Sequence, residues 1–274
     1  MWKLMLTTTI LLIISQNSFG QEAFCPNPCY KHEIKSKYLN ENRDIWVSTP
    51  LEYNDTLEFE VIYVLDAEWR FDLIRNMAFD LGANKKVNQA IIVGIPHVNW
   101  QNKRGVDLTF SQSRVEYDGD MVDSTWYNDT NSGGALNFYN YLTKEVIEFV
   151  GNNYKTNGIE TLIGHSYGGY FAAYLISTKH PFEKLHIYDP SIWFSDGEVI
   201  KRIQTNFNHQ DVKVFLTYQP KPKFHSGKIE ELVEVLKKTK KVELKVVHYL
   251  SETHNSLFLD SFYQGIFYTH GIEK

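Results

Sequence analysis

The sequence predicts a single α/β domain with a mostly parallel central sheet flanked by helices. Two observations carry this prediction. Short apolar runs bounded by turn residues alternate with segments of helical period, and the alternation continues from residue 45 to the C-terminal region without a linker or repeat. With 274 residues, 43% of them hydrophobic and 22% charged, the chain can bury one large core, which excludes a disordered or fibrous protein.

The predicted strands are short and rich in β-branched residues. Such runs are typical of strands that are buried on both faces, as in a parallel sheet. Pro50, Asp66 and Pro96 stop the first three of them. The runs span residues 45–49, 59–65, 90–95, 161–164, 185–188, 212–218 and 242–250.

Segments with helical periodicity lie between these strands. In the segment 228–240, apolar residues including Ile229, Leu232 and Leu236 share one face opposite a charged face. A last amphipathic helix is expected after residue 254. The other predicted helices span residues 71–82, 135–150 and 168–178.

Residues 96–131 interrupt the alternation with a polar and aromatic stretch of irregular pattern. A loop of this length inside a compact domain is usually functional, and we interpret it as a solvated lid or rim. Asp118, Asp120 and Asp123 offer carboxylates for a calcium ion, but they lack the Gly and the terminal Glu of an EF-hand loop. Calcium binding is therefore the weaker alternative.

Residues 1–20 have the layout of a secretory signal peptide. Lys3 precedes an apolar stretch at residues 4–14, and the small residues Ser18 and Gly20 predict cleavage before Gln21. A membrane anchor is the alternative, but the stretch is shorter than the ~20 residues that a spanning helix needs. We therefore expect an exported protein, periplasmic or secreted, with no membrane span after signal removal.

Residues 21–33 form an N-terminal segment ahead of the main domain, residues 34–274, and they hold both cysteines, Cys25 and Cys29. In an oxidising compartment this pair would form a small local disulfide. A zinc site would need further ligands that His32 alone does not supply. We expect no metal and no organic cofactor.

The balance of charges bears on the class of partner. The formal net charge is −5, from 28 basic and 33 acidic residues. This is not the broad positive field that nucleic-acid binding needs. We therefore expect no nucleic-acid partner, and the aromatic content of 15% suits clefts lined by aromatic side chains.

The clearest chemical signal is the run Gly164-His165-Ser166-Tyr167-Gly168-Gly169. Its Gly-x-Ser-x-Gly pattern stands between a predicted strand and a predicted helix, where it forms a nucleophile elbow. The tight turn lifts Ser166 above the carboxyl ends of the strands and aims the next helix N-terminus at any oxyanion formed there. Ser166 is the candidate nucleophile, and an ordinary serine in a strand–helix turn is the alternative.

A serine nucleophile needs a base, and with this motif the histidine follows near the C-terminus. His254 fits that order, because it lies just beyond the last predicted strand. His225, beside the Lys-Pro-Lys loop, is the rival base. His248 lies inside the last strand, where we expect it to be buried in the sheet.

A series of shorter motifs accompanies the serine turn in a particular order and spacing. In these motifs the chain resembles the Putative esterase family of α/β-hydrolases, which includes siderophore (enterochelin) esterases, feruloyl esterases and mycolyltransferases. The likeness runs from about Ile34 to Ile266 and is greatest to exported, siderophore-esterase-like members. The motifs are residues 43–47, 61–66, 91–95, Arg104 with 107–109, 133–135, 164–169, 189–194 and 252–254.

The resemblance implies an α/β-hydrolase fold and specific roles at the site. Ser166 would be the nucleophile and His254 the base. The oxyanion hole would consist of the backbone N–H of Tyr167 and that of Ala67 or Glu68. The resemblance implies no metal and no organic cofactor.

The acid of the triad is where the chain departs from the family. Relatives often place it after the strand that corresponds to residues 212–218, but residues 219–223 contain no carboxylate. Asp189, at the end of the preceding strand, could reach the imidazole from there. Glu252 lies near His254 in the chain, and a Ser–His dyad without an acid is the third possibility.

Arg104 and Asp107 resemble a family pair near the mouth of the site. We expect them to hold the long loop through an ion pair, and contact with substrate is the alternative. A basic patch at residues 221–223 could hold an anionic group such as a catecholate.

Together these observations predict an exported serine carboxylic-ester hydrolase that acts through an acyl-enzyme on a small-molecule ester. An acyltransferase of the same family is one alternative. A catalytically inactive binding homologue, suggested by the missing acid, is the other.

Overall fold

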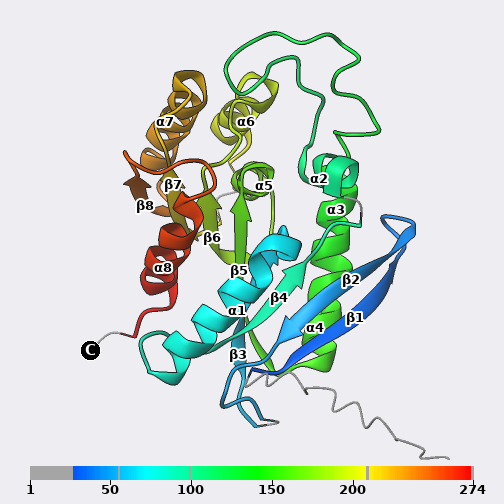
Figure 1. The fold of residues 1–274 in the computed structure, drawn as a ribbon, viewed down its shortest axis with the longest axis vertical. Helices are drawn as coiled ribbons and strands as arrows, with labels where there is room; N and C mark the ends of the chain where they lie inside the picture. Colours follow the sequence, from blue (N-terminus) through cyan, green and yellow to red (C-terminus); the bar gives the residue numbers. More distant parts are fainter. Residues whose placement is uncertain (1–26, 55, 99, 208–209, 273–274) are drawn as a thin grey trace, which may run out of the picture.

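The computed structural model describes residues 27–54, 56–98, 100–207 and 210–272. Its strands form one eight-stranded sheet in the order β1-β2-β4-β3-β5-β6-β7-β8 (Figure 1). The strands β1 and β2 are antiparallel to each other, and β2 is antiparallel to β4, whereas all later pairs are parallel. The predicted mostly parallel sheet is therefore confirmed. The bounds are β1 Cys29–Ser36, β2 Glu41–Ser48, β3 Phe59–Leu65, β4 Ala90–Ile95, β5 Thr156–His165, β6 Phe182–Tyr188, β7 Val212–Tyr218 and β8 Val242–His248.

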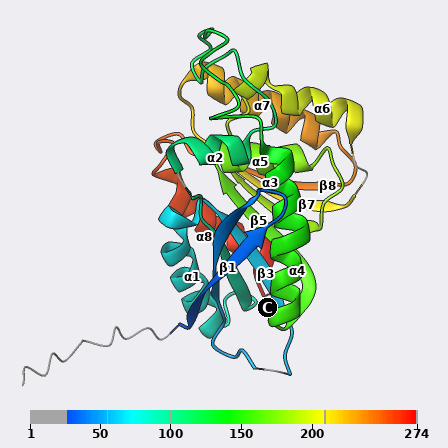
Figure 2. The same cartoon turned by 90° about the vertical axis from the view of Figure 1, so that its right-hand side faces the viewer.

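Helices cover both faces of this sheet, as the view in Figure 2 shows. On one face lie α1 and α8, whose apolar residues Phe71, Phe258 and Phe262 form one core with the sheet. The other helices build a larger core around Phe138 and Phe171. The bounds are α1 Ala67–Ala83, α2 Trp100–Leu108, α3 Ala135–Tyr141, α4 Ile147–Asn153, α5 Tyr167–Leu175, α6 Glu198–Asn206, α7 Lys223–Lys237 and α8 Leu257–His270, with a π-helical turn at Leu142–Val146 and a 3-10 turn at Phe194–Asp196.

The parallel arrangement brings chemistry from distant parts of the chain to one edge of the sheet. Because β3, β5 and β6 are neighbours and run in the same direction, their carboxyl ends meet. Asp66, Ser166 and Asp189 follow directly after these three strands. The loop between β8 and α8, which contains His254, reaches the same edge. A candidate site therefore lies at the carboxyl ends of the central strands.

Several elements differ from the sequence prediction. The strand β1 was not expected, and it begins inside the segment 21–33, so that residues 29–33 are part of the sheet. The helix α2 interrupts the long region that was expected to be irregular, and α6 was also not expected. The predicted helix at 135–150 contains the π-helical turn.

His248 is a further correction. The strand β8 lies at the edge of the sheet and alternates between exposed and half-buried residues, so the expected burial on both faces is wrong. His248 is exposed and stacks on Tyr218 with ring centroids 4.2 Å apart. At this edge of the sheet the covering helices leave the side chains of β8 on both faces partly in contact with solvent.

The predictions for the N-terminus are only partly covered. The expected signal peptide, residues 1–20, and Cys25 lie outside the described residues, so the disulfide with Cys29 stays a prediction. None of the helices in the described ranges combines the length and the apolar character that crossing a membrane requires.

Candidate active site

Ser166 occupies a strained turn between β5 and α5. Its backbone angles are φ 60° and ψ −118°, a region that costs a non-glycine residue roughly 1–3 kcal/mol. Two backbone hydrogen bonds hold the turn: the Ser166 N–H donates to Tyr188 O at 3.0 Å, and the Ser191 N–H donates to Ser166 O at 3.0 Å. The predicted elbow is present, and it presents a half-buried serine at the helix N-terminus.

The glycines around Ser166 are required by close backbone packing. A Cβ on Gly164 would lie 2.1 Å from the carbonyl oxygen of Gly168, and one on Gly169 would lie 3.0 Å from Pro190. A Cβ on Gly168 would meet only ordinary contacts, the nearest at 3.4 Å. The tightest requirements therefore fall on the first glycine of the motif and on the additional Gly169.

His254 is held from two sides. Its Nδ1 lies 2.6 Å from Oδ2 of Asp189, and its backbone carbonyl oxygen accepts a hydrogen bond from Nε2 of His165 at 2.6 Å. Burial, with the neighbouring His254, lowers the pKa of His165 to about 3, so His165 is a neutral donor. The side chain of His254 is 40% exposed, which gives its ring access to the cavity above Ser166.

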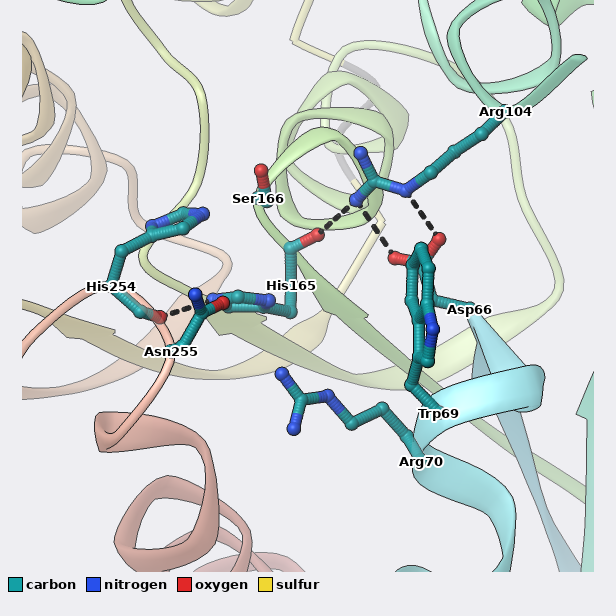
Figure 3. Close-up of a pocket in the computed structure, with 8 residues that line it drawn as sticks. All are labelled: Asp66, Trp69, Arg70, Arg104, His165, Ser166, His254 and Asn255. Atoms are coloured by element: carbon teal, nitrogen blue, oxygen red, sulfur yellow. Dashed lines mark hydrogen bonds and ion pairs between the residues drawn. The ribbon is translucent and has the colours of Figure 1, made fainter. Parts of the chain in front are cut away.

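Ser166 and His254 line the same cavities but are not hydrogen-bonded in this conformation. Figure 3 shows one edge of the His254 ring turned toward Ser166. The Ser166 hydroxyl instead lies 3.4 Å from the Ser191 hydroxyl, within hydrogen-bond distance. The hydrogen bond that a serine nucleophile shares with its base is therefore absent here. Such bonds are often long or poorly aligned in unliganded sites and tighten when substrate binds.

Asp189 is the carboxylate that contacts His254. It follows β6 with φ 38° and is fully buried. Its Oδ2 accepts from His254, while the backbone N–H of Gln219 donates to Oδ1 and the Gln219 side-chain amide donates to Oδ2, both at 3.2 Å. Burial alone would raise the pKa of Asp189. The hydrogen bonds from His225 and His254 have the larger combined effect and hold this pKa well below the usual range. The group is an ionised carboxylate.

Glu252 does not take this position. Its carboxylate accepts a hydrogen bond from the Ser256 hydroxyl at 2.5 Å and stabilises the turn ahead of α8. Of the three possibilities for the acid, the geometry therefore matches Asp189. The loop after β7, which lacks a carboxylate, contributes Gln219 as a donor to it.

His225 is a residue whose place the sequence did not reveal. The sequence allows it as a rival base, but it is buried and lies on the far side of Asp189 from His254, with its Nε2 3.0 Å from Oδ1. Its Nδ1 has no hydrogen-bond partner within the described part of the chain. Two imidazoles thus share one carboxylate. The position depends on α7 beginning beside the end of β6, which no local pattern indicates.

The same three residues are the only group among those described whose ligand atoms come close enough to hold a metal ion. All three are already joined by hydrogen bonds through Asp189, which account for their proximity. The predicted calcium alternative at Asp118, Asp120 and Asp123 does not assemble such a group.

The amides expected in the oxyanion hole lie at two helix N-termini. Tyr167 is the first residue of α5 and Ala67 is the first residue of α1, with Glu68 next to it. Amides in the first turn of a helix have no acceptor within the helix, and the helix dipole favours negative charge there. The role of these N–H groups in an oxyanion hole stays a prediction.

Asp66 stabilises the turn in front of α1. It adopts φ 54° and is buried, and Arg104 binds it with two hydrogen bonds, Nε to Oδ1 at 2.6 Å and Nη2 to Oδ2 at 2.9 Å. His97 lies 3.4 Å from the same carboxylate through Nε2. Burial raises the pKa of Asp66, but Arg104 and His97 lower it well below the usual range.

Asp107 belongs to the same buried network, but it does not pair with Arg104 as expected. Its carboxylate accepts two hydrogen bonds from Arg43 at 2.9 and 2.7 Å and contacts Nδ1 of His97 at 2.9 Å. Burial lowers the pKa of His97, but its bonds to Asp107 and Asp66 raise it to about 9, so this imidazole is charged at neutral pH. Each member of the expected pair thus has its own partner of opposite charge.

Two cavities of different character meet at Ser166. Ser166, Arg104 and His254 line both of them. The first has a volume of about 410 Å³ and is also lined by Asp66, Trp69, Arg70, His165 and Asn255 (Figure 3). The second has a volume of about 360 Å³ and is also lined by Tyr117, Tyr167, Ser191, Trp193, Gln219, Lys221, Pro222 and His225.

Comparisons with known proteins agree with this architecture. A family model described as "Putative esterase" matches residues 36–183. The ferri-bacillibactin esterase BesA of Bacillus subtilis is 24% identical over 207 residues, which is 70% of this chain and 71% of the relative.

Solved structures are similar over most of the chain. An IroE-like serine hydrolase from Shewanella oneidensis superposes with a TM-score of 0.78 at 25% identity, covering 87% of this chain and 79% of the other. The BES protein from Bacillus cereus gives a TM-score of 0.73 at 25% identity and covers 89% and 96%. The predicted α/β-hydrolase fold is confirmed.

Proposed function

The chain belongs to the Putative esterase family, and from this premise we propose that it is a serine hydrolase that cleaves carboxylic esters through an acyl-enzyme. The observation that carries the proposal is the contact of 2.6 Å between Asp189 and His254 beside the strained Ser166. An ionised, buried carboxylate on Nδ1 leaves Nε2 of the imidazole to serve as the base.

In the first half of the reaction, Ser166 Oγ attacks the ester carbonyl while Nε2 of His254 takes its proton. Rotation about one side-chain bond of the serine brings the hydroxyl from Ser191 toward the imidazole. The amides of Tyr167 and of Ala67 or Glu68 then stabilise the oxyanion of the tetrahedral intermediate. Collapse of this intermediate expels the alcohol, which receives the proton from His254.

In the second half, water enters the place that the alcohol has left. His254 removes a proton from this water, which attacks the acyl carbonyl, and the same two amides stabilise the second oxyanion. Collapse of this intermediate breaks the bond between Ser166 Oγ and the acyl carbon, His254 returns the proton to Oγ, and the free acid leaves. Asp189 stays ionised throughout and stabilises the imidazolium that forms in each half-reaction.

The substrate class follows from relatives. BesA is named a ferri-bacillibactin esterase, and the protein from Shewanella is described as IroE-like. We therefore propose that this chain hydrolyses the ester bonds of a siderophore. The apolar cavity with Tyr117, Tyr167 and Trp193 suits an aromatic part of such a molecule.

We also propose that the protein is exported, because residues 1–20 have the composition of a signal peptide. Expression of the full chain in a bacterial host, followed by N-terminal sequencing, tests this. A mature protein that begins at Gln21 supports export, whereas an intact Met1 in the cytoplasmic fraction contradicts it.

The catalytic proposal is tested with Ser166→Ala and a short-chain para-nitrophenyl ester. We expect at least a ~10³-fold loss of kcat, because the nucleophile is removed while the oxyanion hole remains. A fluorophosphonate probe should label the wild-type protein at Ser166 and leave the variant unlabelled. Equal turnover by both proteins would overturn the assignment.

Two alternatives are separated by simple measurements. An acyltransferase would give acylated product when acceptor alcohols are added, whereas a hydrolase gives free acid. An inactive homologue would resist the fluorophosphonate probe. The inactive alternative depends on a missing acid, and the contact between Asp189 and His254 argues against it.

The substrate class is tested separately. Hydrolysis of iron-loaded bacillibactin is compared with hydrolysis of feruloyl and acetyl-sugar esters.

A further inference from the structure

Arg70 lines the 410 Å³ cavity beside Ser166. It is the fourth residue of α1, and Figure 3 shows its guanidinium directed into the space below His165. The aromatic ring of Phe258 supports it from one side, with the guanidinium carbon 4.1 Å from the ring centroid. Packing of this kind holds the side chain in place and leaves its N–H donors for another partner.

Arg70 differs from the other arginine of the cavity in lacking an ion pair. Arg104 is bound by Asp66 through two hydrogen bonds. Among the described residues, neither an ion pair nor a hydrogen bond of Arg70 is present. The pKa of Arg70 is lowered, mainly by burial; the nearby Asp66 raises it, and Arg104 lowers it by a smaller effect. Partly buried charges of this kind are usually paired.

The charges that face this cavity do not balance. Asp66 contributes one negative charge, while Arg104 and Arg70 contribute two positive charges. His165 adds none, because its pKa is lowered to about 3 by burial and by His254. The aspartate and the two arginines that line the cavity therefore sum to one positive charge, in a chain whose formal net charge is −5.

We propose that Arg70 is a specificity-determining residue that binds an anionic group, a carboxylate or a phenolate, carried by the ester substrate. The proposal rests on the hydrolase function above, because it places this group in the cavity that Ser166 also lines. The planar guanidinium can bind two oxygens of such a group at once. Trp69, which lines the same cavity and is 49% exposed, offers an aromatic face to a ring that bears the anion.

Two matched pairs of esters test this proposal. In the first pair the anion is on the acyl side: the para-nitrophenyl ester of para-carboxybenzoate is compared with that of para-carbamoylbenzoate. In the second pair it is on the alcohol side: para-acetoxybenzoate is compared with para-acetoxybenzamide. Each pair differs in one charge at nearly constant size, so the ratio of kcat/KM within a pair measures recognition of the anion.

The variants are Arg70→Gln, Arg70→Lys and a control, Arg202→Gln. Arg202 is also an arginine on an aromatic ring, 4.5 Å from the centroid of Tyr174, but it lies on α6 and lines neither cavity at Ser166. For one of the two pairs, we expect Arg70→Gln to lower the ratio of kcat/KM for the anionic ester to kcat/KM for the neutral ester about tenfold. This is the effect of losing one charge-assisted interaction. Arg70→Lys should recover part of the ratio, and Arg202→Gln should leave it unchanged.

Because both substrates of a pair are measured on the same preparation, partial misfolding of a variant cancels in the ratio. Added salt should reduce the preference of the wild-type protein for the anionic ester and have little effect on Arg70→Gln. Ratios within twofold of wild type in both pairs, or an equal loss in Arg202→Gln, would overturn the role of Arg70 while leaving the esterase intact. Failure of the wild-type protein to cleave any of the four esters would instead count against the proposed function.

Discussion

Two aspartates at equivalent places in the sheet have taken on different tasks. Asp66 follows β3 and Asp189 follows β6, both with positive φ, at 54° and 38°. Both are buried, and both have a pKa well below the usual range. In residue type, backbone conformation and charge state, the two positions are alike.

Their partners differ. Asp66 is bound by the guanidinium of Arg104 and lies beside the charged imidazole of His97, so its surroundings carry positive charge at neutral pH. Asp189 is bound by Gln219 and by two imidazoles, and His254 is partly open to the cavity. A carboxylate that faces fixed cations anchors structure. One that faces an exposed imidazole can stabilise a proton that arrives there during a reaction.

The largest effect that separates the two is expected from Asp189→Asn. We expect kcat for a para-nitrophenyl ester to fall by roughly 10³–10⁴-fold, because the amide no longer stabilises the imidazolium and favours the wrong tautomer of His254. Steady-state kinetics checks this, with circular dichroism to verify the fold. A loss below tenfold would mean that a Ser–His dyad is sufficient.

Asp66→Asn should instead act mainly on stability. It leaves Arg104 without its carboxylate and removes one of the two carboxylates beside His97, and we expect the free energy of unfolding to fall by about 3 kcal/mol. Urea denaturation of this variant beside Asp189→Asn measures the difference. If Asp189→Asn lost as much stability, the division of tasks between the two aspartates would be wrong.

The charged imidazole beside Asp66, that of His97, should make the stability of the protein depend on pH. The pKa of His97 is about 9 in the folded protein against 6.5 as its ordinary value. A raised pKa contributes stability that is fully present below pH 6.5 and is lost as the pH rises through about 9. We expect this contribution to be on the order of 3 kcal/mol. Urea titrations across this window should show a smaller decline in His97→Gln than in the wild-type protein; parallel declines would contradict the assignment.

The smallest effect is expected on the Asp189 side, from His225. His225→Phe removes the donor to Oδ1 of Asp189, and we expect about a tenfold loss of kcat, whereas His225→Gln should retain more activity because its amide can donate. Without His225 the pKa of Asp189 rises, so the deficit should grow as the pH is lowered. A deficit that is independent of pH would indicate that His225 is only part of the packing.

Elements with strong local patterns were predictable. The strands β3, β4 and β7 match the predicted ranges, because continuous apolar runs ended by Asp or Pro are typical of central strands. The strand β1 was missed because its side chains are mostly exposed and polar, with an edge position that gives no apolar run. The helix α2 was missed because it lies in a polar stretch that contains a glycine, Gly105. This glycine is required by a tertiary contact: a Cβ there would come within 2.2 Å of the carbonyl oxygen of Asn131.

The amino-acid sequence by itself determined the alternation of strands and helices and the serine turn, because each depends on residues that are neighbours in the chain. It also placed His254 after Ser166 and just beyond the last predicted strand, which is a matter of chain order alone. Only the tertiary structure decided which carboxylate contacts the imidazole, that His225 binds its other oxygen, and that Arg104 and Asp107 have separate partners. These contacts join residues that are 36 to 65 positions apart. The order of strands in the sheet brings such residues together, and that order depends on which faces pack best once the whole chain has folded.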